Sequence, residues 1–338
     1  MNDNNQPISP DRIMQLIWGY APPLILEAAI SLHIFDTLEA GPMSIPQVAA
    51  ATGASERGLR CLMNALVSLD FLSKRDGRYV LTPESAAFLV SSKDSFQGGI
   101  LRHISRQLIP NWLQLTEAVR TGKPTLAVNR EEKGGAFFSQ FVEDIFAMSY
   151  SAAKALADWL QLEDIKPPYR VLDLAAGSGV WSIALSQKSP CVQVTAVDWP
   201  EVLPVTRRVT QRFGVGARYH YVEGDLLEAD FGEGHQLAIF GHILHSEGER
   251  RDRALIQKVF HSLAPGGKAV VAEMLPNEER TGPPQALIFA VNMLVNTDEG
   301  DTFTFSEIKS WFEQAGFKDV RKLETPGLYP LIIAEKAA

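Results

Sequence analysis

The stretch 170–181 holds the residue types best suited to ligand chemistry, and it reads RVLDLAAGSGVW. An apolar strand ends in Asp173, and a turn containing Gly177 and Gly179 leads into a helix. Such a turn lets the backbone approach a nucleotide closely, because glycine has no Cβ. The dinucleotide fingerprint needs a third glycine, and Ser182 stands in its place. Since Asp173 would also put negative charge beside a phosphate, we expect a nucleoside ligand that carries an amine or hydroxyl groups.

Two more acids follow the next two predicted strands. Asp198 comes after the strand 193–197, 21 residues beyond Gly177, where a carboxylate accepts hydrogen bonds from both hydroxyls of a ribose. Capping of the following helix is the other interpretation of Asp198, and the spacing favours the ribose. Asp225 follows the strand 219–222 and could reach the exocyclic amine of an adenine. Simple turn chemistry after Gly224 explains Asp225 equally well.

A histidine-rich segment, Gly241-His242-Ile243-Leu244-His245, follows the fourth predicted strand, and the fifth strand ends in Glu273. An imidazole, with an ordinary pKa near about 6.5, suits general-base catalysis at neutral pH. His245 could otherwise cap the next helix, and His242 is as suited to lining a pocket as to packing on the sheet. The two histidines lack the carboxylate or cysteine spacing of an ordinary zinc site, so we expect no metal.

Composition narrows the partners of the 338-residue chain, which is long enough for two domains. A net charge of −8 disfavours nonspecific nucleic-acid binding, which needs basic surface. Cys61 and Cys191 stand in apolar contexts, and we interpret them as reduced core thiols. Residues 1–10 lack a signal-peptide pattern, and no uninterrupted apolar run of about 18 residues occurs. We therefore expect a cytoplasmic protein without a membrane partner.

The elements before residue 95 have the pattern of a winged helix-turn-helix. Two helices broken by Pro22-Pro23 precede a short helix between Ser44 and Gly53, and a longer helix begins after Ser55. Two short strands follow, joined by Asp76-Gly77. Five basic and three acidic side chains between residues 55 and 78 leave little charge for DNA. The apolar character of the longer helix also favours a dimerisation domain over a transcriptional regulator.

The remaining chain predicts a helical connection and then a doubly wound α/β domain. Residues 96–156 are helical in pattern, with a loop expected at Gly134-Gly135 and an aromatic-rich segment that could cover a flat ligand. The junction is expected at 164–168. After it, strands and helices alternate, which predicts a mostly parallel sheet. The predicted domains are 1–95, 96–165 and 166–338.

In this order of motifs the chain resembles the class I S-adenosylmethionine-dependent methyltransferases. More narrowly, it is similar to the small-molecule O-methyltransferases of the plant caffeate/flavonoid type and their bacterial natural-product relatives. The resemblance covers almost the whole chain and rests on the motifs 173–179, 198–200, 224–226, 244–245 and 263–267. It implies a Rossmann-like methyltransferase domain preceded by a mostly helical winged-helix dimerisation domain, and hence a homodimer.

For catalysis, the resemblance implies that His245 removes the proton of an acceptor hydroxyl and that Glu273 orients its imidazole. The family usually has an aspartate after the histidine, and this chain has Ser246. A second acid of the family corresponds to the loop after residue 297. Its role stays open among three acids of that loop, Asp298, Glu299 and Asp301.

For binding, the resemblance implies S-adenosyl-L-methionine as the cofactor. Its predicted contacts are Asp173, Gly177, Gly179, Asp198, Trp199, Asp225, Leu226 and Gly241, the last where the family usually has a longer residue. Met148, His242, Asn292 and Met293 are the predicted acceptor contacts. Phenylalanines at 138, 141, 146 and 289 suggest a flat aromatic or polyketide-like acceptor, methylated on a phenolic hydroxyl. N- or C-methylation, or decarboxylation, hydroxylation or pericyclic chemistry on the same scaffold, are the alternatives.

Overall fold

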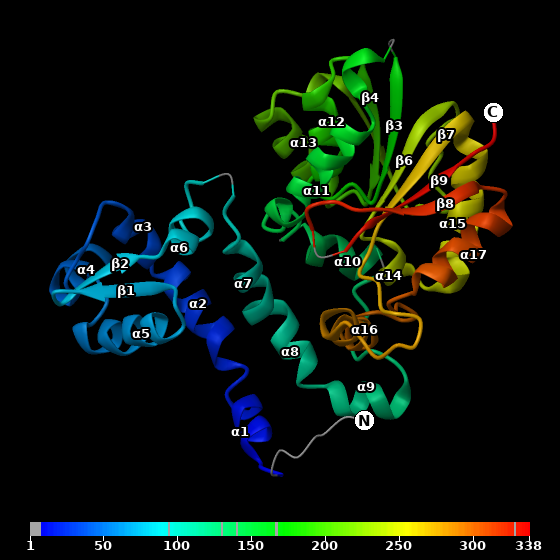
Figure 1. The fold of residues 1–338 in the computed structure, drawn as a ribbon. Helices are drawn as coiled ribbons and strands as arrows, with labels where there is room; N and C mark the ends of the chain where they lie inside the picture. Colours follow the sequence, from blue (N-terminus) through cyan, green and yellow to red (C-terminus); the bar gives the residue numbers. More distant parts are fainter. Residues whose placement is uncertain (1–7, 94, 130, 140, 166–167, 328) are drawn as a thin grey trace, which may run out of the picture. The chain divides into compact units, whose positions relative to one another are not determined.

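The structure, a computed structural model, describes residues 8–93, 95–129, 131–139, 141–165, 168–327 and 329–338 (Figure 1). Backbone contacts divide the chain into two compact units, Met1–Ile109 and Pro110–Ala338. The predicted limits at residues 95 and 165 remain predictions. Of the expected junction 164–168, residues 166 and 167 lie outside the described part.

The first unit consists of short helices and one hairpin. In chain order, its elements are α1 (Asp11–Ile17), α2 (Ala21–Ser31), α3 (Ile34–Glu39), α4 (Ile45–Thr52), α5 (Glu56–Ser68), β1 (Leu72–Arg75), β2 (Arg78–Leu81), α6 (Pro83–Phe88), α7 (Gly99–His103) and the π-helical turn η1 (Ile104–Leu108). Ser44 and Gln47 form a capping box on α4, and the Ser55 hydroxyl accepts the Gly58 amide at the start of α5. These caps confirm the two predicted helix starts.

The hairpin closes the core of the first unit. Asp76 and Gly77 have φ of 49° and 75°, as a two-residue turn between antiparallel strands requires. Tyr79 of β2 is fully buried, and its hydroxyl donates to Asn64 of α5 at 2.7 Å. The expectation for Cys61 was wrong: its side chain is exposed, because α5 turns Leu59, Met63 and Leu66 inward instead.

In the helical stretch Asp11–Ser31, the break between the two helices does not fall at Pro22-Pro23, where it was expected. The stretch's length of 21 residues and mean hydropathy of 1.3 would suit a membrane span, and only 11% of the tested window is buried. Residues 18–20 interrupt it between α1 and α2. Pro22 lies in the first turn of α2, where its missing amide hydrogen costs nothing, and so does not form the break itself. One such stretch near the N-terminus is weak evidence for a membrane.

The second unit alternates strands and helices, as predicted. Its elements are α8 (Ile109–Trp112, which begins at the unit boundary), α9 (Leu115–Thr121), α10 (Glu131–Phe138), α11 (Phe146–Trp159), the 3-10 turn η2 (Leu162–Asp164), β3 (Tyr169–Leu174), α12 (Val180–Lys188), β4 (Val192–Asp198), α13 (Leu203–Arg212), the 3-10 turn η3 (Gly216–Arg218), β5 (Tyr219–Glu223), β6 (His235–Gly241), α14 (Leu244–Glu247), α15 (Glu249–Ser262), β7 (Leu263–Ala272), α16 (Pro284–Asn296), α17 (Phe305–Ala315), β8 (Lys318–Leu323) and β9 (Leu331–Glu335).

Within the described residues, these strands form one seven-stranded sheet in the order β5-β4-β3-β6-β7-β9-β8 (Figure 1). The strands from β5 to β7 are parallel, and β9 runs antiparallel to both β7 and β8. The chain order reverses between β3 and β6, and in such sheets ligands bind at the carboxyl ends of the strands beside this switch point. This is the Rossmann-like fold that the motifs predict.

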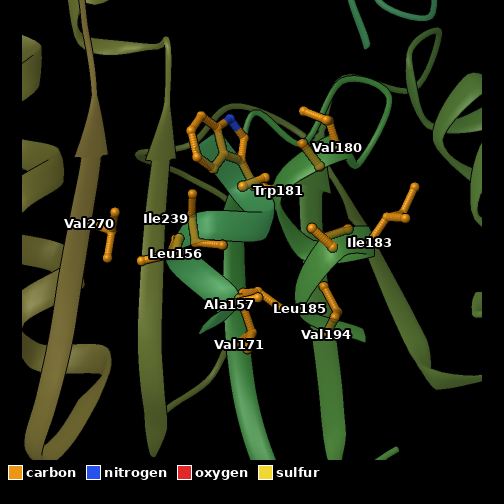
Figure 2. Packing of buried hydrophobic residues seen from close by; sticks show 14 of the residues in the cluster. Leu156, Ala157, Val171, Val180, Trp181, Ile183, Leu185, Val194, Ile239 and Val270 are labelled. Atoms are coloured by element: carbon orange, nitrogen blue, oxygen red, sulfur yellow. The ribbon is translucent and has the colours of Figure 1, made fainter. Parts of the chain in front are cut away.

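Neighbouring residues of each central strand point to opposite faces of the sheet. On β3, Val171 packs with α11 and α12 on one face, whereas Leu172 packs with α15 and α17 on the other. Ile239 and Phe240 of β6 repeat this alternation. Figure 2 shows the first of these clusters, with Trp181 at the start of α12. Burying each such aliphatic side chain contributes about 1.5–3 kcal/mol, so both faces anchor the strand ends that carry the site.

The expected loop at Gly134-Gly135 was wrong, because both residues lie inside α10. A Cβ on Gly134 would come within 2.2 Å of the Trp199 ring and within 2.3 Å of the Val128 carbonyl oxygen. These glycines therefore serve close packing of a helix and not a turn. Local helix propensity penalises glycine, and only the tertiary contact explains its presence here.

Candidate active site

The turn between β3 and α12 lies at the carboxyl ends of the strands, where sheets of this kind form a ligand-binding crevice. Ala175, Gly177 and Gly179 have φ of 49°, 55° and 76°, a left-handed conformation that glycine adopts without strain. The backbone amide of Gly177 donates to Asp198 Oδ2 at 2.7 Å, and the amide of Trp199 donates to Oδ1 at 2.8 Å. Asp198 thus holds the glycine turn in place from the neighbouring strand.

Asp173 and Asp198 form a buried pair of acids beneath this turn, with exposed fractions of 1% and 8%. Asp173 accepts a hydrogen bond from the Ser182 hydroxyl, which explains why serine replaces the third glycine. Burial, together with the charge of Asp198, raises the pKa of Asp173 to about 7. Burial likewise raises the pKa of Asp198 to about 6. Two carboxyl groups whose pKa values lie near neutral pH suit a ligand that brings positive charge and hydroxyl donors, as S-adenosylmethionine does.

Trp199 and Gly241, both predicted to contact the cofactor, are packed against aromatic side chains. The ring of Trp199 lies 5.8 Å from that of Phe138. A Cβ on Gly241 would come within 2.6 Å of the Trp181 indole. Trp181 therefore fills the space of a longer side chain at position 241, which accounts for the departure from the family pattern. Sequence reasoning missed Trp181, although its bulk directly after the glycine turn was a usable signal.

Asp225 and Leu226 follow β5 at the next strand end. Asp225 Oδ1 accepts the Leu227 amide at 2.8 Å, and Oδ2 pairs with the Arg251 guanidinium at 2.5 Å. Leu226 is 7% exposed and packs in the core face that includes α15. Both oxygens of Asp225 are thus oriented by the protein, an arrangement beyond that of a simple turn residue. Arg251 was not predicted, because no local pattern marks it.

His245 and Glu273 form a hydrogen-bonded pair on the other side of the crevice. His245 Nδ1 lies 2.7 Å from Glu273 Oε2, and the His245 backbone amide lies 3.3 Å from Oε1. Burial would raise the pKa of Glu273, but the charge and hydrogen bond of His245 bring it below its ordinary value. An ionised Glu273 can accept a hydrogen bond from the His245 Nδ1–H. The rings of His245 and Phe289 pack nearly perpendicular to each other, with their centroids 4.8 Å apart.

His242 stands beside this pair because of the register between β6 and β7. Gly241 pairs with Ala272, and the His242 amide donates to the Ala272 carbonyl at 3.0 Å. Its φ of 62° is unusual for a residue with a side chain. Desolvation lowers the pKa of His242, and its Nε2 lies 3.3 Å from the Ser149 hydroxyl. One potential ligand atom each of His242, His245 and Glu273 lie within 4.8 Å of one another.

Of the remaining predicted acceptor contacts, two lie on α16. Asn292 Oδ1 accepts the Trp112 indole N–H at 2.7 Å and the Asn296 amide at 3.0 Å. Met293 is buried, whereas Met148 on α11 is 49% exposed. The Asn292 amide oxygen is therefore engaged by the protein. Trp112 was not among the predicted residues.

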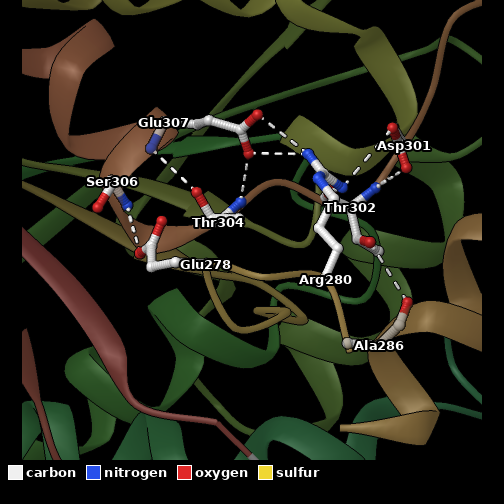
Figure 3. Close-up of polar contacts among 8 residues, drawn as sticks. All are labelled: Glu278, Arg280, Ala286, Asp301, Thr302, Thr304, Ser306 and Glu307. Carbon is white, nitrogen blue, oxygen red and sulfur yellow. Dashed lines mark hydrogen bonds and ion pairs between the residues drawn. The ribbon is translucent and has the colours of Figure 1, made fainter. Parts of the chain in front are cut away.

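The acidic loop after α16 is held by Arg280, as Figure 3 shows. Arg280 donates to the Thr302 carbonyl at 2.8 Å and to Glu307 at 2.9 Å, and it lies 4.0 Å from Asp301. A Cβ on Gly300 would come within 2.4 Å of the His245 carbonyl oxygen, so the loop packs against the catalytic segment. Asp301 faces Arg280, while the roles of Asp298 and Glu299 stay open.

The fold and this crevice together define a class of nucleoside-dependent transferase with a histidine–carboxylate pair opposite an acid-lined glycine turn. Residues 14–91 match the family description of an O-methyltransferase dimerisation domain, and residues 112–318 match that of an O-methyltransferase domain. The chain belongs to this O-methyltransferase family.

Individual relatives agree over the full chain. It is 30% identical over 335 residues to the 3-hydroxy-5-methyl-1-naphthoate 3-O-methyltransferase of Streptomyces sahachiroi, covering 97% of this chain and 96% of the relative. A structure assigned as an O-methyltransferase from Nostoc punctiforme PCC 73102 has a TM-score of 0.89 at 29% identity, with 98% and 100% covered. Human N-acetylserotonin methyltransferase in complex with S-adenosylmethionine has a TM-score of 0.83 at 25% identity, with 100% of both chains covered. The protein is an S-adenosylmethionine-dependent O-methyltransferase that acts on a small-molecule acceptor.

Proposed function

We propose that the acceptor is an aromatic secondary metabolite and that His245 removes the proton of its phenolic hydroxyl. The observation that supports this most directly is the His245–Glu273 hydrogen bond of 2.7 Å. In this proposal the proton on Nδ1 faces Glu273, and Nε2 is available as the base. A phenol with a pKa near about 10 is mostly protonated at neutral pH, so a base of this kind assists its attack.

In this proposal, the cofactor supplies an electrophilic methyl group on a sulfonium. The protein's own residues carry the remaining work. Glu273 keeps the His245 ring in one tautomer and one orientation, and the His245 Nε2 takes the hydroxyl proton. Phe289 against the ring restricts its rotation and keeps water from the base. We also propose that no metal takes part, because a hydrogen bond from Nδ1–H would account for the 2.7 Å contact between His245 and Glu273.

We assign the cofactor to the crevice around the glycine turn. Gly177 and Gly179 would let the backbone approach its amino-acid part, near the carboxyl group of Asp173. Asp198, fixed by two backbone amides, would accept the ribose hydroxyls, and Asp225 would accept the adenine amine. Leu226, Trp199 and Gly241 would complete its apolar surroundings.

The acceptor would lie against α11 and α16. His242, whose ring centroid lies 6.4 Å from that of His245, has a nitrogen that could hydrogen bond a second oxygen of the acceptor. Met148 and Met293 offer apolar contact, and Asn292 offers its amide N–H groups. The relative that methylates a hydroxynaphthoate supports an aromatic acceptor.

We also propose that the protein works in the cytoplasm as a homodimer, with neither nucleic acid nor membrane as a partner. The family match of residues 14–91 and the apolar surface of α1 support the dimer. Six large apolar side chains of α1 and of the residues directly after it are more than half exposed: Ile13, Met14, Leu16, Ile17, Trp18 and Tyr20. Burial of this surface by a second copy would explain the hydropathy of Asp11–Ser31 without a membrane. The net charge of −8 argues against nucleic acid.

The reaction can be tested by incubating the protein with S-adenosylmethionine and a panel of phenolic metabolites. Mass spectrometry should find a product heavier by one methyl group for at least one phenol. Permethylated versions of the same compounds serve as controls and should not react. Addition of EDTA should leave turnover unchanged. A loss of turnover in EDTA would instead indicate a metal ion bound by His242, His245 and Glu273. If the panel gains methyl groups only on nitrogen or carbon, the phenolic acceptor is wrong.

A further inference from the structure

Arg251 connects the predicted adenine end of the crevice with the catalytic helix. Its Nη2 lies 2.5 Å from Asp225 Oδ2, and its Nε lies 2.5 Å from Glu247 Oε2. Asp225 follows β5, whereas Glu247 ends α14, the short helix that contains His245. The Arg251 and Asp225 side chains are each 29% exposed and that of Glu247 is 7% exposed, so the bridge lies mostly within the protein.

The helix α14 depends on contacts of this kind because it comprises four residues, Leu244–Glu247. Such a short helix has little stability of its own. The Asn129 side chain donates to the Ser246 carbonyl at 3.1 Å, and Arg251 holds Glu247. A shift of Glu247 would therefore reach His245, two residues earlier in the same helical turn.

The electrostatic surroundings make Arg251 difficult to replace. Burial raises the pKa of Glu247, against the opposing hydrogen bond and charge of Arg251. Asp252, the next residue, is fully buried, and neither of its carboxylate oxygens has a hydrogen-bond partner among the described residues. Arg251 thus pairs with both Glu247 and Asp225 in a region rich in acids and fixes the orientation of the two carboxylates. A neutral side chain at position 251 would release both carboxylates at once.

We propose that Arg251 is a positioning residue that couples occupancy of the adenine subsite to the placement of the catalytic helix α14. This inference rests on the proposed role of Asp225 toward the adenine amine. An amine that donates to Asp225 favours the orientation of that carboxylate in which Arg251 is bound to it. Arg251 held in this way also holds Glu247, and α14 becomes more ordered when the cofactor is bound. Because coupling between two equilibria is reciprocal, the factor by which cofactor binding favours the ordered form of α14 is also the factor by which loss of the Arg251–Glu247 contact weakens cofactor binding.

The test uses the full chain and two probes, S-adenosylhomocysteine and its inosine analogue, in which a carbonyl oxygen replaces the adenine amine. Calorimetry should show the wild type binding the adenosine probe at least about tenfold more tightly, since Asp225 repels the carbonyl oxygen. Arg251→Met should reduce this preference to about twofold, and Arg251→Lys should restore part of it. Asp225→Asn should abolish or reverse the preference.

Coupling to α14 is read by hydrogen exchange of the backbone amides of residues 244–247. Saturation with S-adenosylhomocysteine should slow their exchange about tenfold in the wild type and not in Arg251→Met or Glu247→Gln. Arg253→Met is the matched control, because Arg253 on the same helix pairs with Glu249 and Gln314 near the surface. It should keep both the preference and the protection. Thermal melts identify any variant that is simply unfolded.

The outcomes separate the two hypotheses. A wild type that does not distinguish the two probes would overturn the adenine role of Asp225, and the coupling with it. A wild type that distinguishes them, together with a folded Arg251→Met variant that keeps the full preference and the cofactor-dependent protection, would overturn the coupling alone. Equal losses in Arg251→Met and Arg253→Met would show a general effect of charge on α15 and would also overturn it.

Discussion

The two sides of the crevice hold buried carboxyl groups at strand ends, yet their electrostatics are opposite. At the ends of β3 and β4, hydroxyl and backbone N–H donors surround Asp173 and Asp198, and burial raises both pKa values, to about 7 and about 6. At the end of β7, the imidazole of His245 brings the pKa of Glu273 below its ordinary value despite complete burial.

On one side the buried carboxyl groups would obtain a cationic partner only from the ligand, whereas on the other side the protein itself supplies that partner. Asp173 and Asp198 lack a cationic partner among the described side chains, so a positively charged cofactor would stabilise their ionised forms. Glu273 already has its partner, so His245, the proposed base, is oriented before any acceptor arrives. Under the proposed function, preorganisation is therefore concentrated on the acceptor side, where proton transfer would require it.

The largest expected effect is on the acceptor side. His245→Ala should reduce turnover by about 10²–10⁴ because the acceptor hydroxyl loses its base. Calorimetry should find S-adenosylmethionine affinity nearly unchanged, since the cofactor side keeps all its contacts. Unchanged turnover with a phenolic acceptor would contradict the base assignment and would remove the distinction between the two sides.

A smaller loss of turnover is expected when Glu273, the carboxylate that contacts His245, is replaced by a neutral side chain. Glu273→Gln should lower turnover by about 10- to 100-fold, since an amide no longer stabilises the protonated imidazole or selects its tautomer. Glu279→Gln, an exposed position in the following loop, is the control and should be silent. Equal activity of both variants in a steady-state assay would show that Glu273 has only a packing role.

On the cofactor side, the expected effect is on affinity. Asp198→Ala should weaken S-adenosylmethionine binding by about 10-fold or more, because the ribose acceptor and the support of the Gly177 amide are both lost. Asp198→Asn keeps one acceptor oxygen and should lie between the alanine variant and the wild type. Calorimetry that detects no loss in Asp198→Ala would exclude the ribose role.

The smallest effect is the pH dependence of stability that the raised pKa of Asp173 gives to the cofactor side. Since the pKa of Asp173 is raised to about 7, the folded protein without cofactor holds a proton that the unfolded chain has released above its ordinary pKa of 3.8. Stability without cofactor should therefore fall as the pH rises from about 4 through about 7.

The same proton competes with a cationic cofactor. S-adenosylmethionine affinity should rise about three- to tenfold between pH 6 and pH 8, and Asp173→Asn should flatten this profile. Calorimetry across this range checks the prediction. An affinity that falls with rising pH in the wild type would contradict the proposed placement of the cofactor charge.

The sequence by itself determined the order of strands and helices, the glycine turn and the acids at the strand ends. Periodicity and turn chemistry depend on neighbouring residues, so Ser44, Ser55 and Asp76-Gly77 were sufficient to predict their caps and hairpin. Errors arose where a distant side chain overrides local preference. Gly134 is helical because it packs against Trp199, and Cys61 is exposed because α5 buries its other face.

Tertiary structure alone decided which of the predicted residues meet. The register of β6 on β7 pairs Gly241 with Ala272, and this brings His242 and His245 to Glu273. The packing of α15 on the sheet places Arg251 between Asp225 and Glu247, and Trp181 fills the space beside Gly241. Charge, burial and pKa follow from these contacts, because an electrostatic partner is a neighbour in space and need not be one along the chain.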